Sequence, residues 1–306
     1  MLVGTKAIST LSTGYLNALQ YATERVQGPD LKAAMDRTAP RVSIIRHPDV
    51  RRMLITQKAH VEGLRALAAY TGFVQDQIKL AHSNVSQDVK DWERLNDLLL
   101  PMVKGYGSEK SYELLAMSLQ VFGGAGYTRD YPIEQYIRDA KIDTLYEGTT
   151  GIQGMDLFFR KIGKDQGATL TRLLTDVQEF AKGEAGNGHL ADQRQRLQTA
   201  LEDVQGMLGS MVQFLGEDLY KIGLNTTPFL FSLSELVIGW LLLRGADVAI
   251  TARAAGDLKD GDDDFYDGKI IAAKWFADNV LPQLSARREI MAATQADVMG
   301  MADAAF

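Results

Sequence analysis

Helical periodicity is the feature that most constrains this chain of 306 residues. Over residues 49–80 apolar side chains recur at steps of three and four, which places them along one face of a helix. The chain has only 7 prolines, and we expect them to fall between periodic segments rather than inside them. No two alternating apolar segments are joined by a tight-turn dipeptide, so we predict no strand pair. The sequence therefore predicts an all-α fold.

The polar and glycine-rich breaks predict where the helices lie. Gly28-Pro29-Asp30 ends the first helix, Ser108 is a suitable N-cap for the fourth, and glycines from Gly123 end that one. Lys164–Gly167 is typical of a linker, which predicts two helical domains, 1–165 and 166–306. In the first domain we expect helices near 5–27, 49–80, 87–103 and 108–122, a short helix after Pro132, and an amphipathic stretch that ends at Lys164. In the second domain we expect helices near 168–182, 192–214, 229–255, 265–284 and 285–304.

Composition narrows the class of protein. The chain is 46% hydrophobic and 24% charged, as globular proteins are, and its net charge of −6 argues against a nucleic-acid binder. The longest apolar run, Leu236–Leu243, is too short to cross a bilayer, and residues 1–6 lack a signal-peptide pattern, so we expect no membrane span. The absence of cysteine excludes a thiol nucleophile and a cysteine-bound metal, and it fits a reducing compartment.

Two local motifs leave alternatives open. Gly123–Gly126 follows a predicted helix, which excludes a dinucleotide fingerprint after a strand. These glycines either end the helix or let a ligand approach the backbone. Glu147 lies before Gly148 at a loop-to-helix junction. It is either a favourable charge at a helix N-terminus or, beside an apolar pocket, a general base.

Metal sites are not indicated by the remaining polar residues. His47, His60, His82 and His189 lack the spacing of a helical metal pair, and we expect them on the surface or in packing. The acidic segment 260–271 places Phe and Ile where a calcium loop requires Gly and Glu.

A set of motifs in fixed order resembles the acyl-CoA dehydrogenase family. The motifs lie at 21–28, 120–127, 131–134, 138–142 and 146–149, with 152–161, 265–269 and 281–282 resembling the long bacterial branch that carries an extra C-terminal helical domain. The resemblance covers only the C-terminal half of such an enzyme. It implies a C-terminal helical bundle of that family followed by a second helical domain.

The resemblance also implies a chemistry. Glu147 matches the base that removes the α-proton of an acyl-CoA, while FAD accepts the β-hydrogen and trans-2-enoyl-CoA is formed. Gly148 matches a position where substrate passes the backbone. The remaining matches are flavin contacts, made within one subunit by Thr149 and more weakly Thr150, and to the flavin of a neighbouring subunit by Arg25, Gln120 and Gly124.

Contacts across subunits imply a homo-oligomer, a dimer or a tetramer. The family resemblance further implies an electron-transfer flavoprotein as acceptor and the bacterial cytoplasm as location, and the half that it does not cover suggests a separate N-terminal subunit. The alternative is a catalytically incomplete helical module that oligomerises or binds a partner without flavin.

Overall fold

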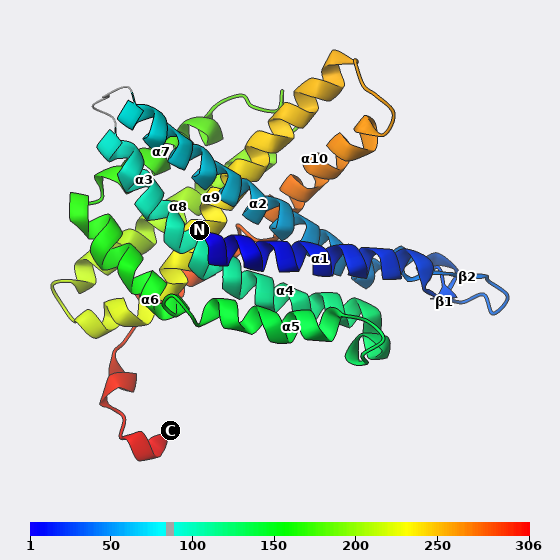
Figure 1. Ribbon diagram of the computed structural model, residues 1–306, viewed down its shortest axis with the longest axis horizontal. Helices are drawn as coiled ribbons and strands as arrows, with labels where there is room; N and C mark the ends of the chain where they lie inside the picture. The colour runs from blue at the N-terminus through cyan, green and yellow to red at the C-terminus, as the bar shows by residue number, and fades with distance from the viewer. Residues whose placement is uncertain (84–88) are drawn as a thin grey trace.

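Eleven α-helices account for most of the computed structural model over the part of the chain that it describes, residues 1–83 and 89–306 (Figure 1). The predicted start of the third helix at Gln87 lies outside the described residues. The helices are α1 (Leu2–Glu24), α2 (Pro48–Ser83), α3 (Val89–Pro101), α4 (Gly107–Phe122), α5 (Ile133–Lys141), α6 (Thr150–Met155), α7 (Ala168–Lys182), α8 (Ala191–Phe214), α9 (Leu219–Ala255), α10 (Asp262–Asn279) and α11 (Gln283–Ala292).

Helices α1 and α4 run side by side in the same direction and define two ends of the bundle. Near the start of α1, Lys6 forms a salt bridge of 2.9 Å with Asp143, just before α6. Near its end, the Tyr21 ring packs 4.5 Å from the ring of Phe122. Fifteen residues of helix separate Lys6 from Tyr21, or about 22 Å at the α-helical rise. We call these the α6 end and the hairpin end of the bundle.

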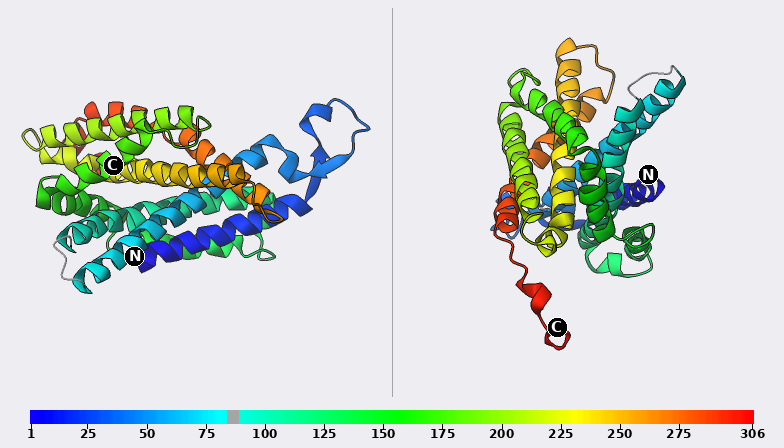
Figure 2. Two further views of the ribbon diagram at one scale, coloured as in Figure 1. Left: turned by 90° about the horizontal axis from the view of Figure 1, so that it is seen from above. Right: turned by 90° about the vertical axis from the view of Figure 1, so that its left-hand side faces the viewer.

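A two-stranded antiparallel sheet at the hairpin end corrects the prediction of no strand pair. Strand β1 (Val26–Pro29) pairs with β2 (Arg41–Ser43), and the hairpin projects beyond the helices (Figure 2). The strands are short and Val26 is 50% exposed, so they carry no alternating apolar pattern. The hairpin also ends α1 at Glu24, three residues earlier than predicted.

A π-helical segment joins α3 to α4 where the sequence suggested a break. Segment η3 (Met102–Tyr106) continues α3 directly into α4, so the predicted N-cap at Ser108 is wrong. Ser108 is buried, and its hydroxyl donates back to the Gly105 carbonyl at 3.3 Å. Pro101 lies inside α3, contrary to the expectation that prolines fall between helices.

The longest helix in the second half is α9, and it begins earlier than predicted. The Asp218 carboxylate accepts from the Tyr220 amide at 2.9 Å and caps it, while Pro228 lies within the helix. By length and composition α9 resembles a membrane span, yet 83% of its most apolar 18-residue window is buried among the described residues. It is a core helix of this fold.

The last predicted helix is shorter than expected. Helix α11 ends at Ala292, and the chain continues through 3₁₀ turns at Asp297–Gly300 and Asp303–Ala305 that lead away from the other helices (Figure 2). The remaining helices of this half, α7, α8 and α10, lie within a few residues of the predicted ranges.

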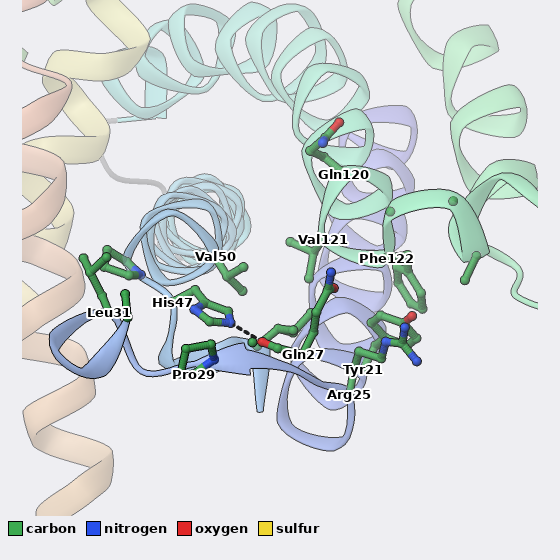
Figure 3. A pocket seen from close by; sticks show the side chains of 17 residues that line it. Tyr21, Arg25, Gln27, Pro29, Leu31, His47, Val50, Gln120, Val121 and Phe122 are labelled. Atoms are coloured by element: carbon green, nitrogen blue, oxygen red, sulfur yellow. Dashed lines mark hydrogen bonds between the residues drawn. The ribbon is translucent and has the colours of Figure 1, made fainter. Parts of the chain in front are cut away.

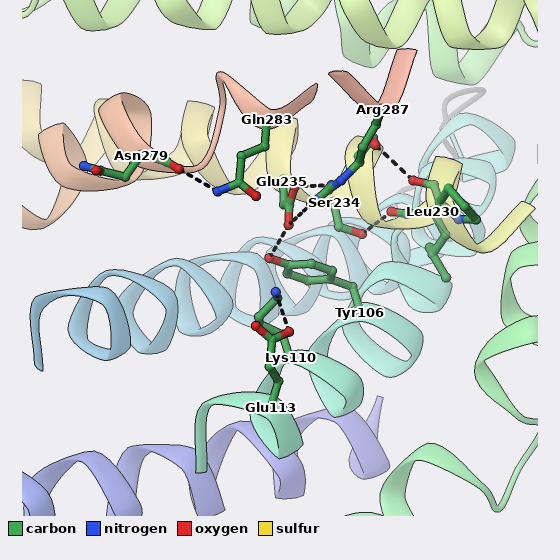
Figure 4. Close-up of polar contacts among 11 residues, drawn as sticks. Tyr106, Lys110, Glu113, Leu230, Ser234, Glu235, Asn279, Gln283 and Arg287 are labelled. Atoms are coloured by element: carbon green, nitrogen blue, oxygen red, sulfur yellow. Dashed lines mark hydrogen bonds and ion pairs between the residues drawn. The ribbon is translucent and has the colours of Figure 1, made fainter. Parts of the chain in front are cut away.

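One hydrophobic core extends through both halves of the chain. It encloses a polar contact in which the buried Tyr106 of η3 donates to Glu235 of α9 at 3.1 Å, and Glu235 also pairs with Arg287 of α11 (Figure 4). Within this core, buried residues of α2 and α4 belong to the same cluster as those of α9 and α10. The boundary at residue 165 stays a prediction.

Candidate active site and cofactor-binding pocket

The turn that carries Glu147 lies at the α6 end of the bundle. It connects η5 (Ile142–Thr144) to α6, and Glu147 and Gly148 have positive φ angles of 55° and 89°. A left-handed backbone is uncommon for a residue with a side chain, and it marks positions that the surroundings must hold. Glu147 is exposed, so its carboxylate faces away from the core.

Two side chains hold consecutive carbonyls of this turn. Gln153 of α6 donates from its amide to the Glu147 carbonyl at 3.2 Å. Lys104 of η3 donates from its ammonium to the Gly148 carbonyl. Lys104 was not among the residues predicted from the sequence. The sequence feature that could have indicated it is a single charged residue within the otherwise uncharged, largely apolar segment Leu98–Tyr106.

Further polar contacts fix the segments on either side of the turn. Before it, the Asp143 carboxylate accepts from Lys6 and from the Tyr146 hydroxyl at 3.0 Å. After it, the buried Thr150 hydroxyl donates to Glu109 at 2.7 Å. Thr149 occupies the N-cap position of α6 without a capping bond from its side chain, which leaves its hydroxyl available to a ligand.

Exposed apolar side chains flank Glu147. Ile142 and Leu145 are each 49% exposed, Tyr146 is 42% exposed and Ile152 is 58% exposed. Several exposed apolar side chains close together in the sequence suit contact with another molecule. The desolvated carboxylate considered from the sequence is not present in this chain by itself. The Glu147 carboxylate would lose contact with water only if another molecule or domain covered these apolar side chains.

A second group of predicted residues lines a cavity of about 830 Å³ at the hairpin end (Figure 3). Arg25 follows α1, Gln120 belongs to the last turn of α4, and Gly124 follows that helix. His47 closes one side and donates from Nε2 to the Gln27 carbonyl at 2.6 Å.

The glycines of this cavity are compatible with both roles left open by the sequence. Helix α4 ends at Gly123, whose φ of 60° and ψ of −144° suit glycine, although they are not those of a left-handed helix. A Cβ atom placed on Gly123 or Gly124 would meet nothing within 4 Å. The backbone here is thus open to a ligand rather than packed against protein.

The predicted site residues therefore form two groups in one chain. Glu147, Gly148, Thr149 and Thr150 lie together at the α6 end, and Arg25, Gln120 and Gly124 lie together at the hairpin end. The length of α1 separates the two groups by roughly 20 Å. A single copy of the chain cannot present both groups to one small part of a ligand.

Comparison with known proteins identifies the family of this chain. Residues 10–160 match the family described as acyl-CoA dehydrogenase, C-terminal domain, and residues 173–302 match acetyl-CoA dehydrogenase C-terminal like. A broad-specificity linear acyl-CoA dehydrogenase of Mycobacterium tuberculosis is 53% identical over all of this chain and 51% of its own length. The chain belongs to the acyl-CoA dehydrogenase family. The resemblance stated from the sequence motifs is confirmed.

Other acyl-CoA dehydrogenases match over similar spans. The 3-methylmercaptopropionyl-CoA dehydrogenase of Ruegeria pomeroyi is 34% identical over 93% of this chain and 47% of its own length. The crystal structure of an acyl-CoA dehydrogenase from Bacillus anthracis, complexed with FAD, shares the fold with a TM-score of 0.70 at 20% identity, over 98% of this chain and 50% of that one. The all-α prediction is thereby confirmed. The chain spans about half the length of the curated relatives that it matches.

Proposed function

We propose that this chain is the helical half of an FAD-dependent acyl-CoA dehydrogenase, with Glu147 as its catalytic base. The observation that carries the proposal is the left-handed turn at Glu147 and Gly148, which two side chains hold at the surface of the bundle. The 53% identity to a linear acyl-CoA dehydrogenase over the whole chain supports it.

The proposed step is removal of an α-proton from an acyl-CoA thioester. The Glu147 carboxylate takes this proton, and the electron pair left on Cα forms the Cα=Cβ bond as the β-hydrogen leaves with its own pair. Bound FAD supplies the acceptor for that hydride. The apolar side chains beside Glu147 would exclude water once the acyl chain or a further domain covers them, which strengthens the carboxylate as a base.

The residues at the hairpin end fit a dinucleotide. The Arg25 guanidinium is exposed at the cavity and suits a pyrophosphate, and the open backbone at Gly124 permits close approach. Gln120 offers an amide beside them. Thr149 is proposed to contact the flavin from the α6 end, and Thr150 more weakly, because its hydroxyl already donates to Glu109.

Separation of the two groups favours an oligomer. The family resemblance implies that Thr149 and Arg25 touch one flavin from different subunits, and the roughly 20 Å of helix between the two ends of one chain is compatible with that division. We propose a homodimer or tetramer on this ground. A separate N-terminal subunit, an electron-transfer flavoprotein as acceptor, a bacterial cytoplasmic location and the domain boundary at residue 165 are proposals that follow from the family.

Flavin retention tests the proposal. The purified chain, alone and mixed with the N-terminal half of a close relative, is incubated with FAD and passed through gel filtration. We expect yellow protein with absorbance near that of bound flavin, at least in the mixture, and bleaching on anaerobic addition of a straight-chain acyl-CoA. Retained flavin that no acyl-CoA reduces would contradict the proposed reaction. Loss of flavin in both samples would favour the helical module without cofactor.

A further inference from the structure

A buried lysine lies beside the proposed base, and the reaction above does not use it. Lys104 is 5% exposed, and its ammonium donates to the Gly148 carbonyl. Burial of an ammonium is costly because water no longer solvates it, so a lysine in such a place is uncommon. Its contact with the residue next to Glu147 indicates a role at the site.

The turn at Glu147 needs a support from outside its own helix. Gln153 binds the Glu147 carbonyl, but it belongs to α6, which the turn itself begins. Lys104 lies 44 residues before Gly148 and on a different element. It therefore fixes the position of the turn relative to the bundle, which a bond within one short segment does not do.

The element that carries Lys104 is itself held from the second half of the chain. A Cβ atom on Gly105 would lie 2.8 Å from Leu230 of α9, so η3 and α9 are in close contact. One residue further, Tyr106 donates to the Glu235 carboxylate, which Arg287 also pairs (Figure 4). The backbone around Lys104 is thus packed against α9 and held there by the Tyr106–Glu235 hydrogen bond.

Three carboxylates on different elements act electrostatically on the ammonium. Glu109 lies on α4, Asp143 lies in η5, and Glu147 lies in the turn. Burial lowers the pKa of Lys104, and the three carboxylates oppose that shift. Asp143 already pairs with Lys6, and Glu109 lies 4.0 Å from Lys141.

We propose that Lys104 is a positioning residue for Glu147: it holds the Gly148 carbonyl and fixes the left-handed turn from which Glu147 projects. The inference rests on the proposed function for its effect on turnover. The structural part, the hold on the turn, applies to the chain whether or not it turns over acyl-CoA.

Three variants separate positioning from a general structural role. Lys104→Met keeps an apolar stem and removes the charge and donor. Lys104→Arg keeps both with altered geometry. Lys141→Met is the control, because it removes a positive charge near Glu109 from a side chain that packs on the Tyr112 ring instead of binding the turn.

The measurements are hydrogen exchange of the full chain and steady-state kinetics of the flavin-loaded enzyme. In Lys104→Met we expect faster amide exchange at residues 146–150, with exchange in α9 unchanged. We expect a fall in kcat of about tenfold or more with a smaller change in KM, as displacement of a reacting group by a fraction of an ångström produces. Lys104→Arg should restore part of kcat, and Lys141→Met should match the wild type.

Each other outcome overturns one of the two claims. Exchange at 146–150 and a kcat that match the wild type in Lys104→Met would refute the positioning role, as would failure of both Lys104 variants to fold. Inactivity of the wild-type enzyme toward acyl-CoA would instead refute the proposed function, and hydrogen exchange would still decide whether Lys104 holds the turn.

Discussion

The hydroxyl of Tyr106 donates a hydrogen bond of 3.1 Å to the carboxylate of Glu235, 129 residues later in the chain. Tyr106 is fully buried and Glu235 is 1% exposed. Burial, with the Glu235 charge, raises the pKa of Tyr106 well above its usual value, so the hydroxyl remains a donor at neutral pH. This contact ties the segment that carries Lys104 to α9.

Removal of the Tyr106 hydroxyl should weaken both halves together. We expect Tyr106→Phe to lower the free energy of unfolding by about 1–3 kcal/mol, because a buried charged acceptor loses one of its donors. Urea unfolding measures the change. Tyr220→Phe, at a side chain that is 58% exposed, is the control and should have little effect. Equal stability of the two variants would show that the buried contact contributes nothing.

Alanine at Gly148 should damage the turn, whereas alanine at Gly151 should not. Gly148 has a φ of 89°, and a Cβ atom there would lie 3.1 Å from the Gln153 amide and 3.3 Å from Ile152. We expect Gly148→Ala to cost about 1–2 kcal/mol of stability through its disallowed backbone alone. Gly151 lies in α6 with open space around it, so Gly151→Ala should be neutral or slightly stabilising. Thermal unfolding of both variants checks the contrast.

The cavity at the hairpin end should respond to substitution in flavin affinity and not in stability. Gly124→Ala meets no atom within 4 Å, whereas a Cβ atom on Gly126 would lie 2.6 Å from that of Phe122. We therefore expect Gly126→Ala to unfold more easily and Gly124→Ala to fold normally but to bind FAD more weakly. Fluorescence titration with FAD and a thermal melt, run on both variants, give the two quantities. A Gly124→Ala protein with unchanged flavin affinity would remove this cavity from the proposed site.

The buried His60 should make the fold sensitive to mild acid. Burial lowers its pKa to about 4, and its Nδ1 donates to the Thr56 carbonyl at 2.8 Å. The unfolded chain binds a proton near pH 6.5 while the folded chain does not, so the free energy of unfolding falls as pH falls below that value. The loss from His60 should reach about 2 kcal/mol between pH 7 and pH 5. His60→Gln should lose less stability over this range than the wild type, and His189→Gln, at an exposed position, should not differ from it. Parallel urea curves at the two pH values make the comparison.

The helices were largely predictable because their apolar faces repeat with the helical period. Helices α2, α7 and α8 lie within a few residues of their predicted ranges for this reason. The β1–β2 hairpin was not predictable, since its strands bury little and carry no alternating pattern. The π-helical link at η3 was also missed, because Ser108 suggests a new helix start, whereas η3 packs against α9 and continues α3 into α4.

The site was predictable only in part, and through resemblance rather than local chemistry. Position alone favoured a simple helix-start charge at Glu147, and only the family motifs indicated a base. Lys104 could not be predicted as a site residue, because no sequence pattern relates it to the carbonyl of Gly148, 44 residues later. The separation of Arg25 from Glu147 depends on how α1 lies in the bundle. The sequence does not give that arrangement, so the separation could not be predicted.

Anaerobic reduction of bound flavin by a straight-chain acyl-CoA tests the central claim most directly. Stopped-flow absorbance is followed for the flavin-loaded wild type and for Glu147→Gln, which keeps the shape of the side chain and removes its basicity. We predict that Glu147→Gln retains flavin and reduces it more slowly by a factor of about 10²–10⁴ or more, as loss of a general base produces. Reduction of the flavin in Glu147→Gln at a rate close to that of the wild type would contradict the account.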